Sequence, residues 1–350
     1  MADTPRVMAK TLVRYAAEVL AAAGVMPANS KIAAECMIMA HLRGFDTHGL
    51  PCLPGYVECL KQGRINPKPN IMVEKTTSWS FRVNADNGLG HLAAHHAMDM
   101  ALEAAHEFGV GMAAVRRSNH FGAASTYSLM ALEHDCVGLV TSNASAVTAP
   151  FGAAQPILGT NPLSVAVPGG RRPPFVIDMA TSEGARKKVR LALEKGTPLP
   201  PGWALDDQGN PTTDPEKALS GVMLPFGGMK GSAITILLDI LSGVLSGANF
   251  GGDVLSVYTN QERESGNGNF FLSFKINAFM PVETFKSRMD DELGRIRSLQ
   301  PAKGFAEVIY PGYKEHYIQK KRSKNGIPLD TNLLENLSQL GRSLGVEPPR

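Results

Sequence analysis

Apolar residues recur at helical spacing along the first part of the chain. They do so over residues 12–26 and again over residues 32–42, and Asn29 and Ser30 stand between the two runs, where a helix cap is expected. The pattern therefore predicts two amphipathic helices near the N-terminus, the second of them capped at Asn29-Ser30.

The pattern of apolar and polar residues changes after a stretch rich in Pro, Gly and Asn at residues 63–70. From there, short apolar runs typical of strands alternate with longer helical periods, which indicates an α/β centre. The helix at residues 233–245 is apolar throughout, so we expect it to be buried. The expected strands cover residues 79–83, 110–115, 136–141, 175–179 and 270–276, and the expected helices cover residues 92–108, 124–134, 185–194, 233–245, 281–299 and 333–344.

Three segments lack a clear helical or strand pattern. Residues 142–174 are rich in Gly, Pro, Asn and Ala, and are either a set of turns or a binding-loop region. Residues 199–215 form an irregular segment that is too long for a simple connector. The basic run at residues 320–324 is interpreted as a solvated face.

Composition narrows the class of protein. Hydrophobic residues make up 43% and charged residues 19% of the 350, an ordinary mix for a soluble protein with a substantial core. The net charge of +3 is too small to indicate a nucleic-acid partner, and no apolar stretch is long enough to cross a membrane. The four cysteines lack zinc or disulfide spacing and the N-terminus lacks a signal core, so we expect reduced thiols in the cytoplasm.

A glycine pattern at residues 88–93, G-L-G-H-L-A, follows an expected strand and opens an expected helix. That is the context of a Rossmann dinucleotide loop, and Arg116 and Arg117 after the next strand would suit a 2′-phosphate. However, the chain before the pattern does not look like the buried first strand of a β-α-β unit. In addition, no acidic residue lies at the end of the next expected strand. A plain strand-to-helix turn explains the pattern at least as well.

Histidine is a candidate acid or base near neutral pH. His91 and His95 share a helix face, but no acid or cysteine completes a metal site, so a helix-surface role is favoured over metal binding. His48 lies in a charged loop, R-G-F-D-T-H-G, directly after a helix, and His120 lies in S-N-H-F-G directly after a buried strand. From spacing alone, structural and catalytic roles stay open for both.

Three further segments hold small polar or glycine-flanked residues. Residues 159–162, G-T-N-P, and 178–182, D-M-A-T-S, either surround a ligand with hydroxyls and amides or only close turns. Residues 225–231, P-F-G-G-M-K-G, put Lys230 at the start of a helix, where it can hold a phosphate or carboxylate. The spacing is not that of a P-loop, so hydrolysis of a nucleoside triphosphate is unsupported.

Taken together, these segments resemble one family, the malate/L-lactate dehydrogenase family of the L-sulfolactate dehydrogenase type. The resemblance runs from Leu12 to Gly345 and rests on the order of R-G-F-D-T-H-G, S-N-H-F-G, G-T-N-P, D-M-A-T-S, P-x-G-W, P-T-T-D-P and P-F-G-G-M-K-G. That family also includes ureidoglycolate dehydrogenases, 2,3-diketo-L-gulonate reductases and Δ1-piperideine-2-carboxylate reductases.

The resemblance implies an α/β fold other than the Rossmann fold. A sheet-based central domain, residues 73–280, would bind NAD or NADP, and a helical domain would be built from both chain ends, residues 1–72 and 281–350. It also implies a homodimer and a reaction without a metal. The glycine pattern at residues 88–93 then becomes a structural turn.

The resemblance also assigns site residues. His48 matches a proposed proton donor oriented by Thr47, and His120 matches a second proposed acid/base; of the two, His48 is favoured. Substrate contacts are implied for Tyr56 and Thr160. Cofactor contacts are implied for His120, Phe121, Gly122, Asp178, Met179, Ala180, Lys230 and Gly312.

One departure from the family concerns the substrate. The family pattern H-G-x-x-R ends in an arginine for the substrate carboxylate, whereas residues 48–52 here are H-G-L-P-C. Cys52 cannot supply a charged fork, so carboxylate binding should weaken by about 2–5 kcal/mol unless Arg186, Arg117 or Lys187 compensates. A milder departure is Tyr313 after Gly312, where relatives usually have glutamate.

The implied reaction is hydride transfer between the nicotinamide and C2 of a small 2-oxo or 2-hydroxy acid. The same resemblance leaves open the reduction of a cyclic 2-imino acid. A cofactor-binding homologue without turnover is the third alternative, and the missing arginine at Cys52 is its only support.

Overall fold

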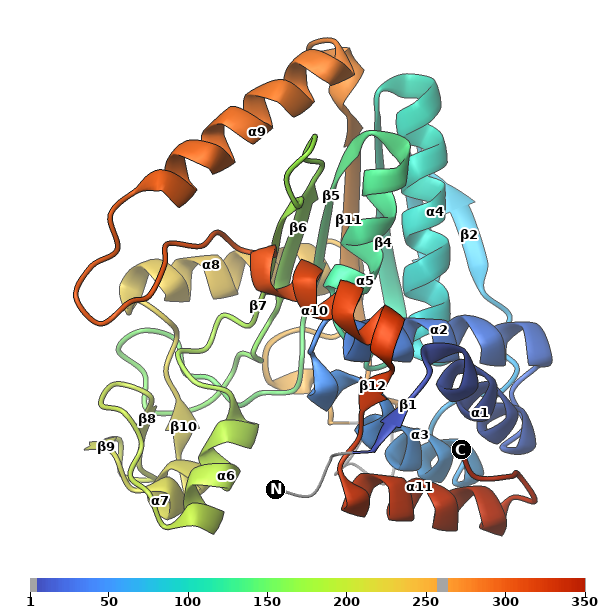
Figure 1. Ribbon diagram of the computed structural model, residues 1–350. Helices are drawn as coiled ribbons and strands as arrows, with labels where there is room; N and C mark the ends of the chain where they lie inside the picture. Colours follow the sequence, from blue (N-terminus) through green and yellow to red (C-terminus); the bar gives the residue numbers. More distant parts are fainter. Residues whose placement is uncertain (1–4, 257–263, 350) are drawn as a thin grey trace.

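A seven-stranded sheet forms the centre of the molecule (Figure 1). The computed structural model describes residues 5–256 and 264–349. Within these residues β3 and β4 are the one parallel pair of the sheet, and the other neighbours run antiparallel. In spatial order the strands are β2 (Met72–Lys75), β3 (Ser80–Asn84), β4 (Val110–Ser118), β11 (Asn267–Lys275), β5 (Cys136–Ser142), β6 (Leu163–Val167) and β7 (Phe175–Met179).

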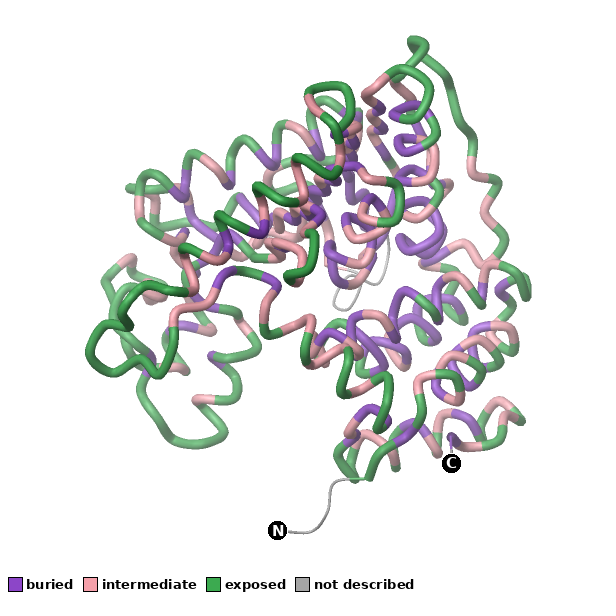
Figure 2. The backbone as a smooth tube through the Cα atoms, turned by 45° about the horizontal axis from the view of Figure 1, so that its top comes forward, coloured by how far each residue is buried: buried purple, intermediate pink, exposed green. Residues whose placement is uncertain are grey.

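One long helix, α4 (Gly90–Phe108), connects the parallel strands and covers one face of the sheet. Figure 2 shows buried residues concentrated in this helix and the neighbouring strands. Most side chains that α4 buries are alanines, so its backbone lies close to β4. A Cβ atom at Gly111 would lie 2.0 Å from the carbonyl oxygen of Ala101, which is why glycine stands there.

The glycine pattern at residues 88–93 is the turn from β3 into α4. A Rossmann sheet would continue with further parallel strands, but the next neighbour of β4 is the antiparallel strand β11. The structure therefore agrees with a structural turn and not with a Rossmann dinucleotide loop.

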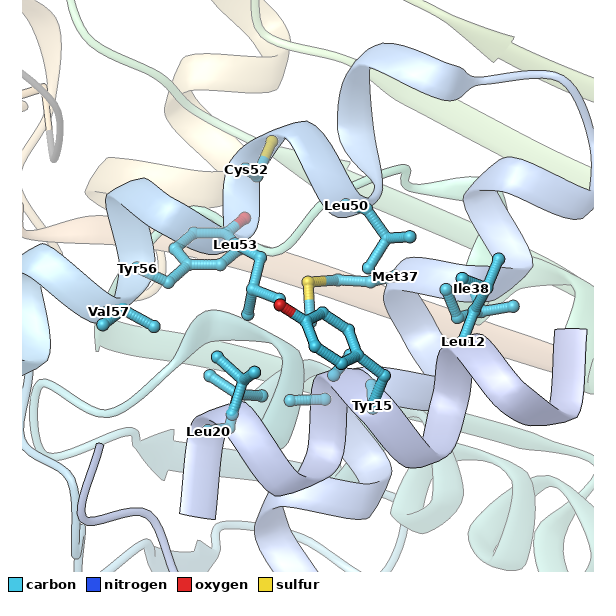
Figure 3. Packing of buried hydrophobic residues seen from close by; sticks show 14 of the residues in the cluster. Leu12, Tyr15, Leu20, Met37, Ile38, Leu50, Cys52, Leu53, Tyr56 and Val57 are labelled. Atoms are coloured by element: carbon cyan, nitrogen blue, oxygen red, sulfur yellow. The ribbon is translucent and has the colours of Figure 1, made fainter. Parts of the chain in front are cut away.

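Both chain ends meet in a helical cluster beside the sheet (Figure 1). The hydroxyl of Tyr15 donates a hydrogen bond to the carbonyl oxygen of Leu337, which ties the N-terminal to the C-terminal part of this cluster. Figure 3 shows Tyr15, Met37 and Leu53 packed together, with Cys52 at the edge. The elements are α1 (Ala9–Ala22), α2 (Pro27–Leu42), α3 (Leu53–Lys61), α11 (Thr331–Ser343) and the antiparallel pair β1 (Arg6–Val7) with β12 (Ile327–Pro328).

Helix α9 (Val282–Ser298) makes polar contacts with the central part of the chain. The carboxylate of Asp290 accepts hydrogen bonds from the backbone amides of residues 170–172, in the turn between β6 and β7. Lys286 pairs with Asp135 at 2.6 Å. The division into a helical domain (residues 1–72 and 281–350) and a central domain (residues 73–280) stays a prediction.

A small third unit follows β7. It has a three-stranded sheet in the order β10-β8-β9 and a core of its own around Val189 and Leu199. The segment expected to be an irregular loop at residues 199–215 contains two of its strands. Its elements are α6 (Arg186–Lys195), β8 (Ala204–Leu205), β9 (Pro211–Thr212), α7 (Pro215–Ser220) and β10 (Val222–Met223).

The apolar helix predicted at residues 233–245 corresponds to α8 (Met229–Asp239) and one π-helical turn, η4 (Ile240–Val244). The expectation that it is buried is wrong, because Leu237, Val244 and Leu245 are each more than half exposed. An apolar sequence cannot distinguish a core helix from one that leaves an apolar face open.

One other local prediction is wrong, and a second holds for most of its residues. Helix α2 begins at Pro27, which fills the first helical position, so Asn29 and Ser30 lie inside the helix and not at its cap. The basic run at residues 320–324 belongs to a helix that the pattern did not predict, α10 (Tyr313–Asn325). The interpretation of this run as a solvated face holds for Lys320, Lys321, Ser323 and Lys324, which are exposed, but not for Arg322, which pairs with Asp46.

The remaining elements are short. The helix predicted at residues 124–134 is divided into two pieces, and β6 lies within the region expected to be turns. The short helices are η1 (Asp46–His48), η2 (Leu50–Cys52), α5 (Ser125–Ser128), η3 (Leu129–His134), η5 (Gly251–Asp253) and η6 (Ile276–Ala278).

Candidate active site

The loop of residues 43–52, hereafter the His48 loop, is fixed by a buried histidine. His41, at the end of α2, accepts a hydrogen bond from the amide of Leu50 at Nε2 (2.9 Å), and its Nδ1 lies 3.0 Å from the carboxylate of Asp46. A glycine must follow His48, because a Cβ atom at Gly49 would lie 2.2 Å from the His41 ring. Two points of the loop, Asp46 and Leu50, are therefore tied to one side chain.

Arg322 holds the same loop from α10. Its guanidinium donates to both carboxylate oxygens of Asp46 and, at 2.5 Å, to the carbonyl oxygen of His41. Burial by itself would raise the pKa of Asp46, but the hydrogen bonds from His41 and Arg322 and the charge of Arg322 outweigh it and lower that pKa to about 2. Asp46 is thus an anion at any pH near neutrality.

Within this loop, His48 is paired with its neighbour. The hydroxyl of Thr47 and Nδ1 of His48 lie 2.9 Å apart, which leaves Nε2 for another partner. Desolvation by the surrounding protein lowers the pKa of His48, although the residue is exposed in this chain; the charge of Asp178 raises that pKa and the charge of Lys187 lowers it. His48 is therefore neutral at neutral pH.

His120 lies next to His48 with its ring stacked at a centroid distance of 5.9 Å. The hydroxyl of Tyr56, a fully buried residue of α3, lies 2.5 Å from Nδ1 of His120. Burial, and then the charges of His48 and His91, lower the pKa of His120 to about 3. Three of the predicted residues, from three separate segments, thus meet at one point.

His91 lies behind this group. The expectation that it has a helix-surface role is wrong, because its side chain is 0% exposed and the ring packs edge-on against Tyr56. Neither ring nitrogen has a hydrogen-bond partner among the described residues, and burial lowers its pKa to about 4. His95, which was expected to share its face, pairs instead with Asp99 at 2.8 Å.

The G-T-N-P and D-M-A-T-S segments lie side by side. The backbone amide of Thr181 donates to the carbonyl oxygen of Thr160 at 2.8 Å, and the Thr181 hydroxyl donates to the same oxygen and to that of Asn161. Asp178 accepts a hydrogen bond from the amide of Ser125, and its charge acts on His48. Burial raises the pKa of Asp178.

A cavity of about 440 Å³ lies between the end of β7 and the start of α10. Three residues predicted to bind the cofactor line it, namely Asp178, Met179 and Gly312. Arg43 and Lys314 also line it, and sequence analysis assigned neither of them. Arg43 opens the R-G-F-D-T-H-G motif, so the motif held a signal for it that was not used.

Other predicted residues lie apart from this group or make different contacts. Cys52 is buried and donates its S–H to the carbonyl oxygen of Thr47 at 3.3 Å. Phe121 is buried and stacks on Tyr127, while Gly122 lies against the backbone of His48. Lys230 is exposed at the start of α8, and Ala180 is exposed after β7.

Of the three cations named as candidates to replace the arginine that is missing at Cys52, two are engaged elsewhere. Arg186 donates to the carbonyl oxygen of Leu219 at 2.6 Å. Arg117 pairs with Glu264 and Asp86, so it is also a poor candidate for a 2′-phosphate. Lys187 is the one whose charge reaches His48.

Among residues 5–256 and 264–349, no helix is long and apolar enough to cross a membrane. In the same residues no group of three or more His, Cys, Asp or Glu side chains is arranged to hold a metal ion.

Comparison with known proteins decides the family. The model of the family described as malate/L-lactate dehydrogenase matches residues 7–338. The chain belongs to this family. It is 39% identical to an L-sulfolactate dehydrogenase of Methanocaldococcus jannaschii over 94% of each chain. It is 31% identical to the ureidoglycolate dehydrogenase (NAD(+)) of Escherichia coli K12, over 95% of each.

Solved structures of this malate/L-lactate dehydrogenase family have the same fold. The sulfolactate dehydrogenase from Methanocaldococcus jannaschii superimposes with a TM-score of 0.92 at 37% identity, covering 98% of both chains. The expected α/β fold of the L-sulfolactate dehydrogenase type is therefore confirmed.

Proposed function

We propose that the protein is an oxidoreductase that transfers hydride between NAD(H) or NADP(H) and C2 of a small 2-oxo or 2-hydroxy acid. The observation that carries the proposal is the meeting of Thr47, His48, His120 and Tyr56 in a member of this dehydrogenase family. Arg43 and Phe45 of the same His48 loop line a cavity. Sulfolactate and ureidoglycolate, named for two relatives, are both 2-hydroxy acids.

His48 is the proposed acid/base. The Thr47 hydroxyl engages Nδ1, so Nε2 is the nitrogen that exchanges a proton with the substrate oxygen. A neutral His48 can accept that proton when the alcohol is oxidised, and once protonated it can return it when the 2-oxo acid is reduced. His120, whose pKa of about 3 keeps it neutral, is proposed to orient Tyr56 and to contact the cofactor.

The residues present fit a dinucleotide. The cavity has carboxylates that accept ribose hydroxyls and cations that attract phosphate, and the buried Nε of Arg43 has no partner among the described residues. When bound, the cofactor supplies or accepts the hydride. The residues proposed to hold it are His120, Phe121, Gly122, Asp178, Met179, Ala180, Lys230 and Gly312.

For the substrate we propose contacts from Tyr56, Thr160 and the region of Cys52. Arg186 was a candidate for the carboxylate, but its guanidinium already donates to Leu219. The charge of Lys187 reaches His48, so Lys187 is the better candidate. A single flexible ammonium binds a carboxylate less rigidly than a guanidinium fork does.

We also propose that the protein acts as a homodimer in the cytoplasm. The exposed apolar face of α8 and η4, formed by Leu237, Ile240, Val244 and Leu245, supports a partner subunit there. The four cysteines are free thiols, which suits a reducing compartment.

The test is the loss of NADH or NADPH absorbance with purified protein and a panel of substrates. The panel holds pyruvate, oxaloacetate, 2-oxoglutarate, 3-sulfopyruvate, 2,3-diketogulonate and a cyclic 2-imino acid. The proposal predicts turnover of a 2-oxo acid that His48→Ala abolishes while the protein still binds the cofactor. Turnover of the imino acid alone would favour the reductase alternative, and tight cofactor binding without any turnover would favour a non-catalytic homologue.

A further inference from the structure

Arg43 is a buried cation without a counter-ion. Its side chain is 2% exposed, and among the described residues no carboxylate oxygen lies within 4.0 Å of it. Nη1 donates to the neutral amide oxygen of Gln319 at 3.2 Å, and Nε has no partner in the same residues. Because burying an unpaired charge is costly, proteins pair nearly every buried guanidinium with an anion.

Two carboxylates lie near Arg43 without neutralising it. Asp178 and Glu315 line the same cavity, and their charges raise the pKa of Arg43 against the lowering effect of burial, which is the largest influence. Asp178 is itself held by the amide of Ser125. The cavity wall thus carries two cations, Arg43 and Lys314, next to two acids.

The first residues of helix α10 also line the cavity. α10, a helix of 13 residues, begins directly after Gly312. The amide of Tyr313 donates to the carbonyl oxygen of Tyr310, which leaves the amides of Lys314 and Glu315 as the first-turn donors at this wall. Gly312 has a φ of +88°, and a Cβ atom there would lie 2.8 Å from the backbone nitrogen of Val176. Glycine is therefore what allows the helix start to reach β7.

We propose that Arg43, with Lys314 and the N-terminus of α10, binds phosphate oxygens of the dinucleotide. This rests on the proposed function, and it goes further by assigning the phosphate to a residue outside the predicted cofactor contacts. The neighbouring acids fit the same ligand, because a ribose presents hydroxyl donors directly beside its phosphate. The donor set thus matches a sugar phosphate better than an apolar or a purely anionic ligand.

The experiment compares ligands with and without phosphate, by calorimetry or fluorescence titration. The wild-type protein should bind ADP about tenfold or more tightly than adenosine, and in Arg43→Gln this preference should fall to about threefold or less. The Kd for NADH should rise by about 10- to 100-fold in Arg43→Gln and by a few-fold in Lys314→Gln. Lys321→Gln, an exposed lysine on the same helix away from the cavity, is the matched control and should leave the Kd unchanged.

Circular dichroism of each variant checks the fold, and Lys314→Gln keeps the test valid if Arg43→Gln does not fold, because Lys314 is exposed. In that case an unchanged NADH Kd in Lys314→Gln overturns the proposal. If the wild type oxidises NADH but Arg43→Gln binds NADH and ADP as the wild type does, the proposal is also overturned and the proposed function stands. A raised KM for the 2-oxo acid with an unchanged NADH Kd would assign Arg43 to the substrate carboxylate and overturn it too. A wild-type protein that does not bind NADH overturns both.

Discussion

Arg43 and Arg322 belong to the same interface, between α2 and α10, and they differ in what neutralises them. Arg322 has a two-pronged contact with Asp46 and reaches the backbone of His41. Arg43 is the more buried of the two, yet within the described residues its polar contact is with the neutral amide of Gln319. One guanidinium is satisfied by the protein and the other is not.

The difference between the two arginines distinguishes two parts of the site, the His48 loop and the cavity beside it. The His48 loop is organised before any ligand arrives, because its ion pair, its buried histidine and its glycine fix it from within. The cavity beside it contains a buried guanidinium, Arg43, that has no ion-pair partner within 4.0 Å among the described residues, although Asp178 and Glu315 lie near it. Both arrangements favour the reaction of a dehydrogenase. A fixed acid/base lowers the activation free energy, because it needs no reorientation, and an unpaired cation adds to cofactor affinity.

Loss of Arg322 should have the largest effect. Arg322→Gln leaves Asp46 without its main cation, so we expect a loss of about 1–3 kcal/mol in the free energy of unfolding and a fall in kcat of about tenfold or more. Urea denaturation and steady-state kinetics measure the two effects. Arg342→Gln, on the exposed face of α11, is the control. Wild-type kcat in a folded Arg322→Gln protein would mean that the ion pair does not position His48.

Adding a cation at Cys52 should have the next largest effect. Cys52→Arg would supply the charged fork that the family has there, so kcat/KM for simple 2-oxo acids should rise by about tenfold. Cys52→Ala removes the S–H contact with Thr47 and adds no charge, so it should not reproduce the gain. If Cys52→Arg folds and shows no gain with pyruvate or oxaloacetate, this position does not limit carboxylate binding.

The Asp46 ion pair also predicts an acid dependence of stability. The folded pKa of Asp46 is about 2, below its ordinary value of 3.8, so its contribution is present above pH 4 and is lost as the pH falls towards 2. Asp46→Asn should flatten this part of the stability profile, measured by urea denaturation from pH 2 to pH 6. An identical slope in the wild type and the variant would contradict the assignment.

Lys187 should have the smallest effect. Its charge helps to lower the pKa of His48, so Lys187→Met should raise that pKa. For oxidation of the 2-hydroxy acid, which needs neutral His48, the acid limb of the kcat/KM profile should move to higher pH by less than about one unit. The neighbouring Lys188→Met is the control, because no effect of Lys188 on His48 is expected. A shift to lower pH would contradict the predicted sign.

Much of the fold could be predicted from local pattern. Strands β4 and β5 are apolar runs in the sequence, and α4 has a long apolar period, so their positions were predicted to within a few residues. Helix α10 was missed because none of its residues is fully buried and it has no apolar stripe to detect. Its contacts with α2 are ion pairs and hydrogen bonds to residues some 276 positions away.

For the candidate site, too, some features could be predicted from the sequence and others could not. Thr47 and His48 are neighbours in the sequence, and the family resemblance implied that the Thr47 hydroxyl orients the His48 ring, as their 2.9 Å contact allows. The contact of Tyr56 with His120 spans 64 positions. The family resemblance implied that both residues belong to the site, but it did not predict their contact. Arg43 was overlooked because a sequence does not indicate that a charged residue lacks a counter-ion.

The measurement that tests the contrast most directly is the thermal unfolding of Arg43→Gln and Arg322→Gln, each with and without saturating NADH. Ligand binding raises Tm through mass action, so the rise reports cofactor affinity separately from the stability of the free protein. We predict that Arg322→Gln lowers the Tm of the free protein by several degrees and keeps the NADH-induced rise. We predict that Arg43→Gln leaves the Tm of the free protein unchanged or higher and loses most of the rise. An equal NADH-induced rise in Arg43→Gln and the wild type would contradict the account.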